Sequence, residues 1–430
     1  MSTIQVARRQ SALLPDSLAF WGVAGVLALF MGAASAPSPL YQIYAAEWRF
    51  SSLTLTVVFA LYAIALLAAL LVTGRLSDHV GRRPVIIAAL LAEMAAMVCF
   101  IAADSTLVLG LARVLQGAAT GTAIGALSAA LVELSPGPAP VVNSASPAFG
   151  LAAGALGASA LIQYGPAPTR LVYWLLLAGF AAGTVLAAVT RETGERRPGA
   201  LASLVPNASV SPRARPMFFR VLPCLVALWA LSGFYLSLGP GLAASITGSG
   251  NLLWGGLVIF LLCGCGGLAV VLARAATARS AMLWGCAALF IGVGLTFASI
   301  ATGTFPLFVA GSIVAGAGFG LSFLGAFRTL AGLAALSERA GTIAVIYIAS
   351  YLAFSIPIVA AGIATTSFST HDVALVFSAT VAGLAAIGTC AGLPAHRPAP
   401  GEPSAPRTTA DLPPCPGTVP PHTGRATDAL

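Results

Sequence analysis

The chain has 430 residues, of which 58% are hydrophobic and only 8% are charged, and its formal net charge is +8. So little charge cannot cover the surface of a water-soluble protein of this size, and the mean hydropathy of +0.94 points the same way. All 21 basic residues are Arg. We interpret them as membrane-topology signals, and no nucleic-acid partner is predicted.

Apolar runs of about 20 residues recur along the chain, and a helix of that length crosses the hydrocarbon core of a bilayer. The sequence therefore predicts an all-α polytopic membrane protein. Its twelve predicted spans are residues 17–39, 52–73, 84–103, 106–133, 142–163, 170–190, 219–240, 251–273, 281–301, 305–330, 341–363 and 372–393. A polar connection, 191–218, separates two predicted six-helix domains, 1–190 and 219–393. Residues 394–430, rich in Pro and Thr, are predicted to be a disordered cytoplasmic tail.

The arginines orient these spans. With a cytoplasmic N-terminus, eighteen of the 21 fall in cytoplasmic segments, Arg49 and Arg170 fall outside, and Arg113 lies within a span. This pattern predicts an inner-membrane protein with both termini in the cytoplasm. The N-terminal apolar run, which follows Arg8 and Arg9, also resembles a cleaved signal peptide, but cleavage would leave eleven spans and place one terminus on the wrong side.

The densest polar cluster, "GRLSDHVGRRPV" from Gly74 to Val85, lies between spans 2 and 3. Its spacing resembles the signature loop of the major facilitator superfamily, G-x-L-x-D-x-x-G-R-[KR]. The matching positions are Gly74, Leu76, Asp78, Gly81, Arg82 and Arg83. The resemblance implies two pseudo-symmetric six-helix halves that alternate access to a solute. An ordinary charged loop that obeys the topology rule is the alternative interpretation.

The same resemblance assigns partners to this loop. It implies that Asp78 faces the start of span 11, near Gly341, and that Arg82 pairs with Glu133 at the end of span 4. Together with Gly74, Gly81 and Arg83 these residues would form a conformational latch between the halves. Asp78 can also cap a helix N-terminus, where a negative charge is favourable.

Two ionisable residues lie inside predicted spans, where charge is costly and most often functional. Glu93 lies about nine residues into span 3, roughly 14 Å deep at 1.5 Å per residue. Counted from the turn between spans 3 and 4, its Cα height differs from that of Arg113 by about 4–5 Å. We expect Glu93 either to pair with Arg113 or to be protonated, because burial disfavours the charged form. A proton-carrying role is the alternative.

Span 4 also carries "RVLQG", in which Arg113, Gln116 and Gly117 resemble a motif of the twelve-span drug exporters that implies proton coupling. A structural Arg neutralised by a nearby acid is the competing interpretation. In span 5 the exporter pattern is incomplete, because Gly150 and Gly154 are present without the Gly-Pro pair. The direction of transport is therefore open.

The second set of spans resembles the first. "QGAATGTAIGAL" and "AGAGFGLSFLGA" superpose with Gly117 over Gly316 and Gly121 over Gly320, an offset of 199 residues. Parallel repeats of this kind are typical of one large group of transporters. The uncharged polar and aromatic candidates for the solute pathway are Ser35, Gln116, Tyr235, Ser322, Tyr347 and Tyr351.

These features predict a secondary transporter, not an enzyme: a monomer in the lipid bilayer that exports small organic or drug-like molecules by proton antiport. No nucleotide-binding loop, metal-ligand spacing or other cofactor motif is present in the sequence. Apolar pathway candidates favour a lipophilic or weakly polar small-molecule substrate. The alternatives are an importer of a small metabolite, a membrane-embedded enzyme, and a transport-dead sensor or assembly partner on the same fold.

Overall fold

The computed structural model describes residues 14–194, 197–206, 208–210, 212–333 and 338–390, and all regular structure in these ranges is helical. The predicted tail, 394–430, lies outside the described residues, as do Arg8 and Arg9. Within these described residues, twelve helical spans are long and apolar enough to cross a membrane, which confirms the predicted number. Their apolar composition and their length, rather than any amphipathic period, make them membrane helices.

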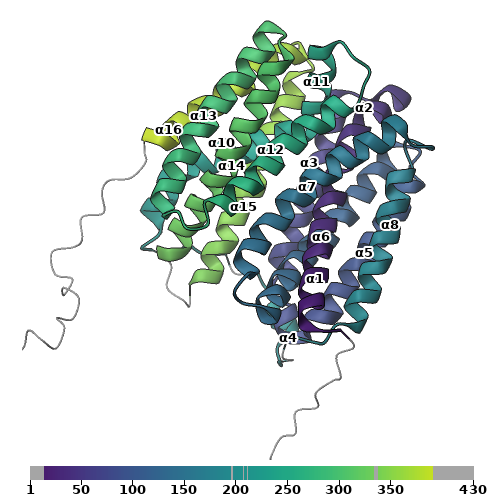
Figure 1. Ribbon diagram of the computed structural model, residues 1–430, viewed down its shortest axis with the longest axis vertical. Coiled ribbons are helices and arrows are strands. Elements are labelled where there is room, and N and C mark those ends of the chain that lie inside the picture. The colour runs from purple at the N-terminus through teal and green to yellow at the C-terminus, as the bar shows by residue number, and fades with distance from the viewer. Residues whose placement is uncertain (1–13, 195–196, 207, 211, 334–337, 391–430) are drawn as a thin grey trace, which may run out of the picture. The chain divides into compact units, whose positions relative to one another are not determined.

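The long helices follow one another in chain order, and the longest connection is the one between α8 and α10 (Figure 1). Those that form the first six spans are α1 (Asp16–Ser35) with α2 (Pro37–Trp48), α3 (Ser52–Thr73), α5 (Arg82–Ile101), α6 (Thr106–Leu134), α7 (Ala139–Tyr164) and α8 (Leu171–Val189). Those that form the last six are α10 (Arg215–Ser237), α12 (Leu253–Leu272), α13 (Ala278–Thr302), α14 (Phe305–Leu333), α15 (Arg339–Ala364) and α16 (Thr370–Cys390). The short helices are α4 (Ser77–Val80), α9 (Ala200–Ser203) and α11 (Gly239–Thr247).

The first span extends further than the sequence predicted. Its expected end was residue 39, but α2 continues it to Trp48. Pro37 and Pro39 lie in the first turn of α2, where a missing N–H breaks no helical hydrogen bond, and Ala36 keeps a right-handed helical conformation (φ −55°, ψ −36°). The prolines therefore divide the span without ending it. Span 7 has a similar division, between α10 and α11.

The glycines that the internal repeat aligned have equivalent structural roles. Gly117 and Gly121 pack α6 against α3, and Gly316 and Gly320 pack α14 against α12. At each of the four, an added Cβ would overlap a backbone carbonyl oxygen of the neighbouring helix. These oxygens belong, in the same order, to Tyr62, Leu66, Leu262 and Gly266. Only glycine allows helices to approach so closely, so the repeat reflects a shared helix-packing requirement.

The first six spans contact the last six mainly through two helix pairs, α7 with α12 and α3 with α15 (Figure 1). A Cβ at Gly362 of α15 would overlap the hydroxyl of Thr56, and the rings of Phe59 and Phe354 lie 5.0 Å apart. The extension α2 contacts α11, where Gln42 approaches Gly241. The two sets of helices are therefore closely packed at the end opposite the 74–83 loop.

Candidate functional site

The loop between α3 and α5 makes a turn that requires glycine. Gly81 has φ +106°, in the left-handed region that residues with a Cβ rarely adopt. A Cβ at this position would also lie 2.7 Å from a carboxylate oxygen of Glu192. The turn reverses the chain from α4 into α5 and places Arg82 at the first position of α5.

Arg82 contacts two acidic residues of this region, of which the family resemblance implied one, Glu133. Its guanidinium group donates to Asp78, to the hydroxyl of Ser77 (2.7 Å) and to Oε1 of Glu133 (3.0 Å from Nη2). The predicted Arg82–Glu133 contact is therefore confirmed. Asp78 pairs with Arg82, and the three atoms nearest to a Cβ placed on Gly341 belong to Ser209. The start of α15 thus lies against the central connection.

Sequence reasoning missed Glu192, which lies three residues beyond the end of α8. Its carboxylate accepts hydrogen bonds from the backbone N–H groups of Arg82 (2.7 Å) and Arg83 (3.2 Å). Free N–H groups in the first turn of a helix favour an anion, and Glu192 supplies it from a distant part of the chain. The backbone of Arg197 also donates to the carbonyl oxygen of His79 (2.9 Å). The beginning of the central connection therefore packs on the 74–83 loop.

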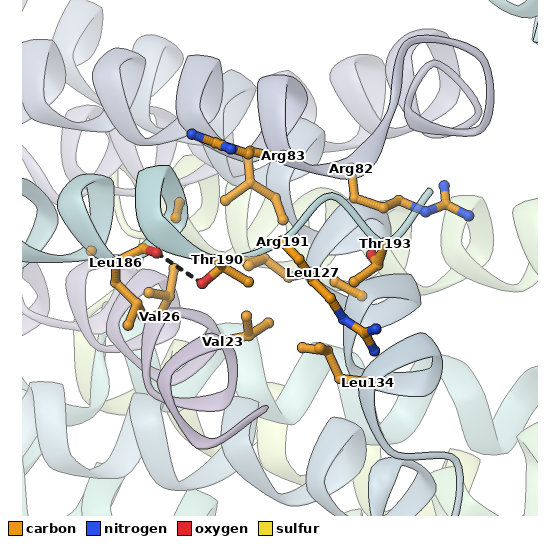
Figure 2. Close-up of a pocket in the computed structure, with 14 residues that line it drawn as sticks. Val23, Val26, Arg82, Arg83, Leu127, Leu134, Leu186, Thr190, Arg191 and Thr193 are labelled. Carbon is orange, nitrogen blue, oxygen red and sulfur yellow. Dashed lines mark hydrogen bonds between the residues drawn. The ribbon is translucent and has the colours of Figure 1, made fainter. Parts of the chain in front are cut away.

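A cavity lies behind this loop, between α1, α5, α6 and α8 (Figure 2). Aliphatic side chains form most of its wall, including those of Val23, Leu127 and Leu186. Figure 2 shows that Arg82 and Arg83 extend their guanidinium groups in opposite directions, so the two cations do not converge on one point. The cavity lies among the first six helices, and Thr190, Arg191 and Thr193 also line it.

The main polar cluster inside the first six helices is built around Arg113 of α6, which is completely buried. Its Nε donates to the hydroxyl of Tyr41 (2.6 Å), and its Nη1 donates to the carbonyl oxygen of Ala34 (3.0 Å) and to Oε1 of Gln116 (2.7 Å). The guanidinium carbon also lies 5.2 Å from the ring centroid of Tyr62. Such contacts compensate a buried cation for the loss of water.

Gln116 connects Arg113 with Glu93, so the direct ion pair, one of the two alternatives that the sequence predicted for Glu93, is not formed. The Gln116 amide accepts from Arg113 at one end, and at the other it donates to Oε1 of Glu93 (3.2 Å) and to the carbonyl oxygen of Ala33 (3.0 Å). Glu93 and Gln116 are completely buried. One oxygen of Glu93, Oε2, and one nitrogen of Arg113, Nη2, have no hydrogen-bond partner. We call Glu93, Gln116 and Arg113 the buried triad.

Three of the predicted pathway residues instead serve contacts between helices. Ser35 donates to the carbonyl oxygen of Leu151 (2.8 Å) and joins α1 to α7. The hydroxyl of Tyr235 is hydrogen-bonded to Thr296 (2.9 Å), within the last six helices. Ser322 is completely buried and lies against Gly285. These side chains are satisfied by protein partners or covered by packing, and the structure does not bring them together at one place.

Tyr347 and Tyr351, by contrast, belong to a group of aromatic rings. They stack on each other with ring centroids 6.4 Å apart, and the ring of Trp229 lies 6.0 Å from Tyr351. Trp229 also contacts Phe319, Phe323 and Phe354, which we name together with Trp229 and Tyr351 the Trp229 cluster. The rings come from α10, α14 and α15, and sequence reasoning identified only Tyr351 because these helices are far apart along the chain.

The fold has a known counterpart. The chain matches the family model described as Major Facilitator Superfamily over residues 23–293, more than half of its length. Among solved structures it is similar to the nucleoside transporter NupG, with a TM-score of 0.69 and 12% identity over 88% of this chain and 100% of that one. No curated protein matches it in sequence. Given the family match, the twelve membrane helices and the signature loop, the chain belongs to the Major Facilitator Superfamily of membrane transporters.

Proposed function

We propose that this transporter exports small, weakly polar organic molecules in exchange for protons, and that Glu93 of the buried triad carries the proton. The observation that carries the proposal is the geometry of the triad. An acid and a base are both fully buried, yet an uncharged amide separates them. A direct ion pair would favour a permanently ionised Glu93, whereas this arrangement leaves one of its oxygens without a partner and able to accept a proton.

A change in the protonation of Glu93 would change the net charge of the triad. With Glu93 ionised the triad is neutral, and with Glu93 protonated it carries the full charge of Arg113. Inside a low-dielectric bundle such a difference is worth several kcal/mol. Tyr62 of α3 lies over the guanidinium group, and α3 packs against α15 of the last six helices. The charge of the triad would therefore be sensed where the first six helices contact the last six.

The 74–83 loop would couple this change in charge to a movement of the two halves. We propose that residues 1–190 and 219–393 are the two moving halves, and that Gly74, Asp78, Gly81, Arg82, Arg83 and Glu133 form a latch between them. Arg82 binds Asp78 and Glu133 at once, and it thereby holds together the part of the latch that belongs to the first half. With the arginine-rich end in the cytoplasm, the packed end of α2 and α11 would face outward. The same orientation places both termini inside and the chain in the inner membrane.

The test is drug tolerance and vesicle transport in an efflux-deficient bacterium. The wild-type protein is expected to raise tolerance to at least one compound in a panel of lipophilic toxins, and everted vesicles should accumulate that compound when their interior is acidified. The variant Glu93→Gln should lose this accumulation. Glu47→Gln is the matched control, because Glu47 is exposed on α2 and lies outside the triad. Accumulation that persists after a protonophore is added, or in Glu93→Gln, would contradict the proposal.

A further inference from the structure

We propose that the Trp229 cluster is a binding site for a flat, uncharged aromatic solute, which stacks on the indole ring and accepts a hydrogen bond from its N–H group. This inference names the substrate class of the transporter and so rests on the proposed function.

The rings around Trp229 leave its face without a parallel partner. Phe319, Phe323 and Phe354 stand nearly perpendicular to the indole, at 82°, 89° and 80°, with centroids 5.5–6.0 Å away. The fourth neighbour, Tyr351, is inclined at 33°. A planar molecule that entered between these rings would meet one face for stacking and ring edges at its sides. Offset stacking and edge-to-face contacts are the two arrangements that aromatic pairs prefer.

The polar atom of Trp229 has no partner inside the protein. Its Nε1 is shielded from solvent and makes no hydrogen bond, although a buried indole N–H is ordinarily paired. The hydroxyl of Ser355 is likewise buried and unpaired, and Ser355 lies one helical turn beyond Tyr351, on the same face of α15. A solute with a hydrogen-bond acceptor would satisfy the indole and offset the cost of that unpaired group.

Packing in a protein core explains this cluster less well than a binding site does. In a core pair of the same chain, Phe100 and Tyr173 lie parallel at 4.7 Å, and their exposed fractions are 2% and 0%. Trp229, Phe319 and Phe323, in contrast, are only half-buried even though they contact one another. Their remaining accessible surface means that the cluster borders open space rather than filling it.

The position of the cluster suits a transported solute and favours a solute without charge. Phe354 contacts Phe59 of α3, so the cluster reaches the contact between the first and last six helices. The same helix α3 carries Tyr62, whose ring covers the guanidinium group of Arg113. A cationic solute would be repelled by Arg113, whose Nη2 is already without an acceptor. An uncharged aromatic molecule avoids that repulsion and still meets the rings.

A matched pair of probes tests the inference on the purified full-length protein. 2-Naphthol and decahydro-2-naphthol share a fused two-ring skeleton and one hydroxyl group, but only the first is flat and aromatic. Binding of each is measured by equilibrium dialysis against empty detergent micelles. Because an aromatic stack is worth about 0.5–1.5 kcal/mol, the wild-type protein should prefer 2-naphthol by roughly 2- to 12-fold.

Three variants complete the test. Trp229→Leu should abolish the preference, and Trp229→Phe should retain it while binding 2-naphthol more weakly, because the ring remains but the N–H donor is lost. Trp284→Leu is the control, since Trp284 is 72% exposed on α13 and should behave like the wild type. Equal binding of the two probes to the wild-type protein, or a preference that survives Trp229→Leu, would overturn the inference.

The result separates this inference from the proposed function. Binding is measured without a proton gradient, and Glu93→Gln should keep the preference for 2-naphthol. If Glu93→Gln transports normally but Trp229→Leu loses the preference, proton coupling through Glu93 fails and the aromatic site stands. If the wild-type protein shows no preference while transport still depends on Glu93, the aromatic site fails and the proposed function stands.

Discussion

Removal of the bridge in the buried triad should destabilise the protein strongly. In Gln116→Leu, Arg113 would lose a 2.7 Å hydrogen bond, and the carbonyl oxygen of Ala33 and the carboxylate of Glu93 would each lose a donor. A charge-assisted hydrogen bond contributes about 1.5–3 kcal/mol. An interhelical bond inside a membrane contributes about 0.6 kcal/mol on average. The sum is a loss of about 3–4 kcal/mol in the free energy of unfolding.

Reversible unfolding in mixed SDS and detergent micelles measures this change. Gln42→Leu is the matched control, because the amide nitrogen of Gln42 is buried without a hydrogen-bond partner. We expect that control to change the free energy of unfolding by less than about 1 kcal/mol. If Gln116→Leu loses no more stability than Gln42→Leu, then the hydrogen bonds of Gln116 are not what stabilises the buried charges, and the reasoning is wrong. Measuring the double variant with Glu93→Gln would give the coupling energy between Gln116 and the acid.

The remaining predictions concern the latch and the topology. Asp78→Asn should impair transport without preventing membrane insertion, because it removes a charge partner of Arg82. Arg75→Ala is the control and should transport normally. Substrate flux in vesicles compares the two variants, and normal flux in Asp78→Asn would refute the latch. A cysteine at Ala202, which is exposed beside the buried Ser203, should react with a membrane-impermeant maleimide only from the cytoplasmic side, and labelling of intact cells would refute the proposed orientation.

The membrane helices could be predicted from sequence because each is specified locally. A run of apolar residues lowers the free energy of a helix in the bilayer whatever its neighbours are, so span 2 was predicted with its observed bounds, Ser52–Thr73. The end predicted for span 1, residue 39, was too early for a local reason as well. Pro37 and Pro39 lie in the first turn of α2, where proline is tolerated, and α2 continues the span to Trp48.

Contacts along one motif or one hairpin were partly predictable. The resemblance of the 74–83 loop to a known family implied the Arg82–Glu133 contact, which the structure forms. Counting residues along spans 3 and 4 placed Glu93 and Arg113 at similar heights. It gave no information on the rotation of either helix about its axis, and that rotation places the amide of Gln116 between the two charges.

The sequence by itself determined the number of membrane helices, the glycine positions at which they pack closely, and the family loop, because these depend on residues that are neighbours along the chain. Only the tertiary structure decided that Glu192 caps α5 and that Trp229 meets rings from α14 and α15. Those contacts join segments roughly 90 to 130 residues apart, and they form only when the free energy of packing whole helices has fixed which faces meet.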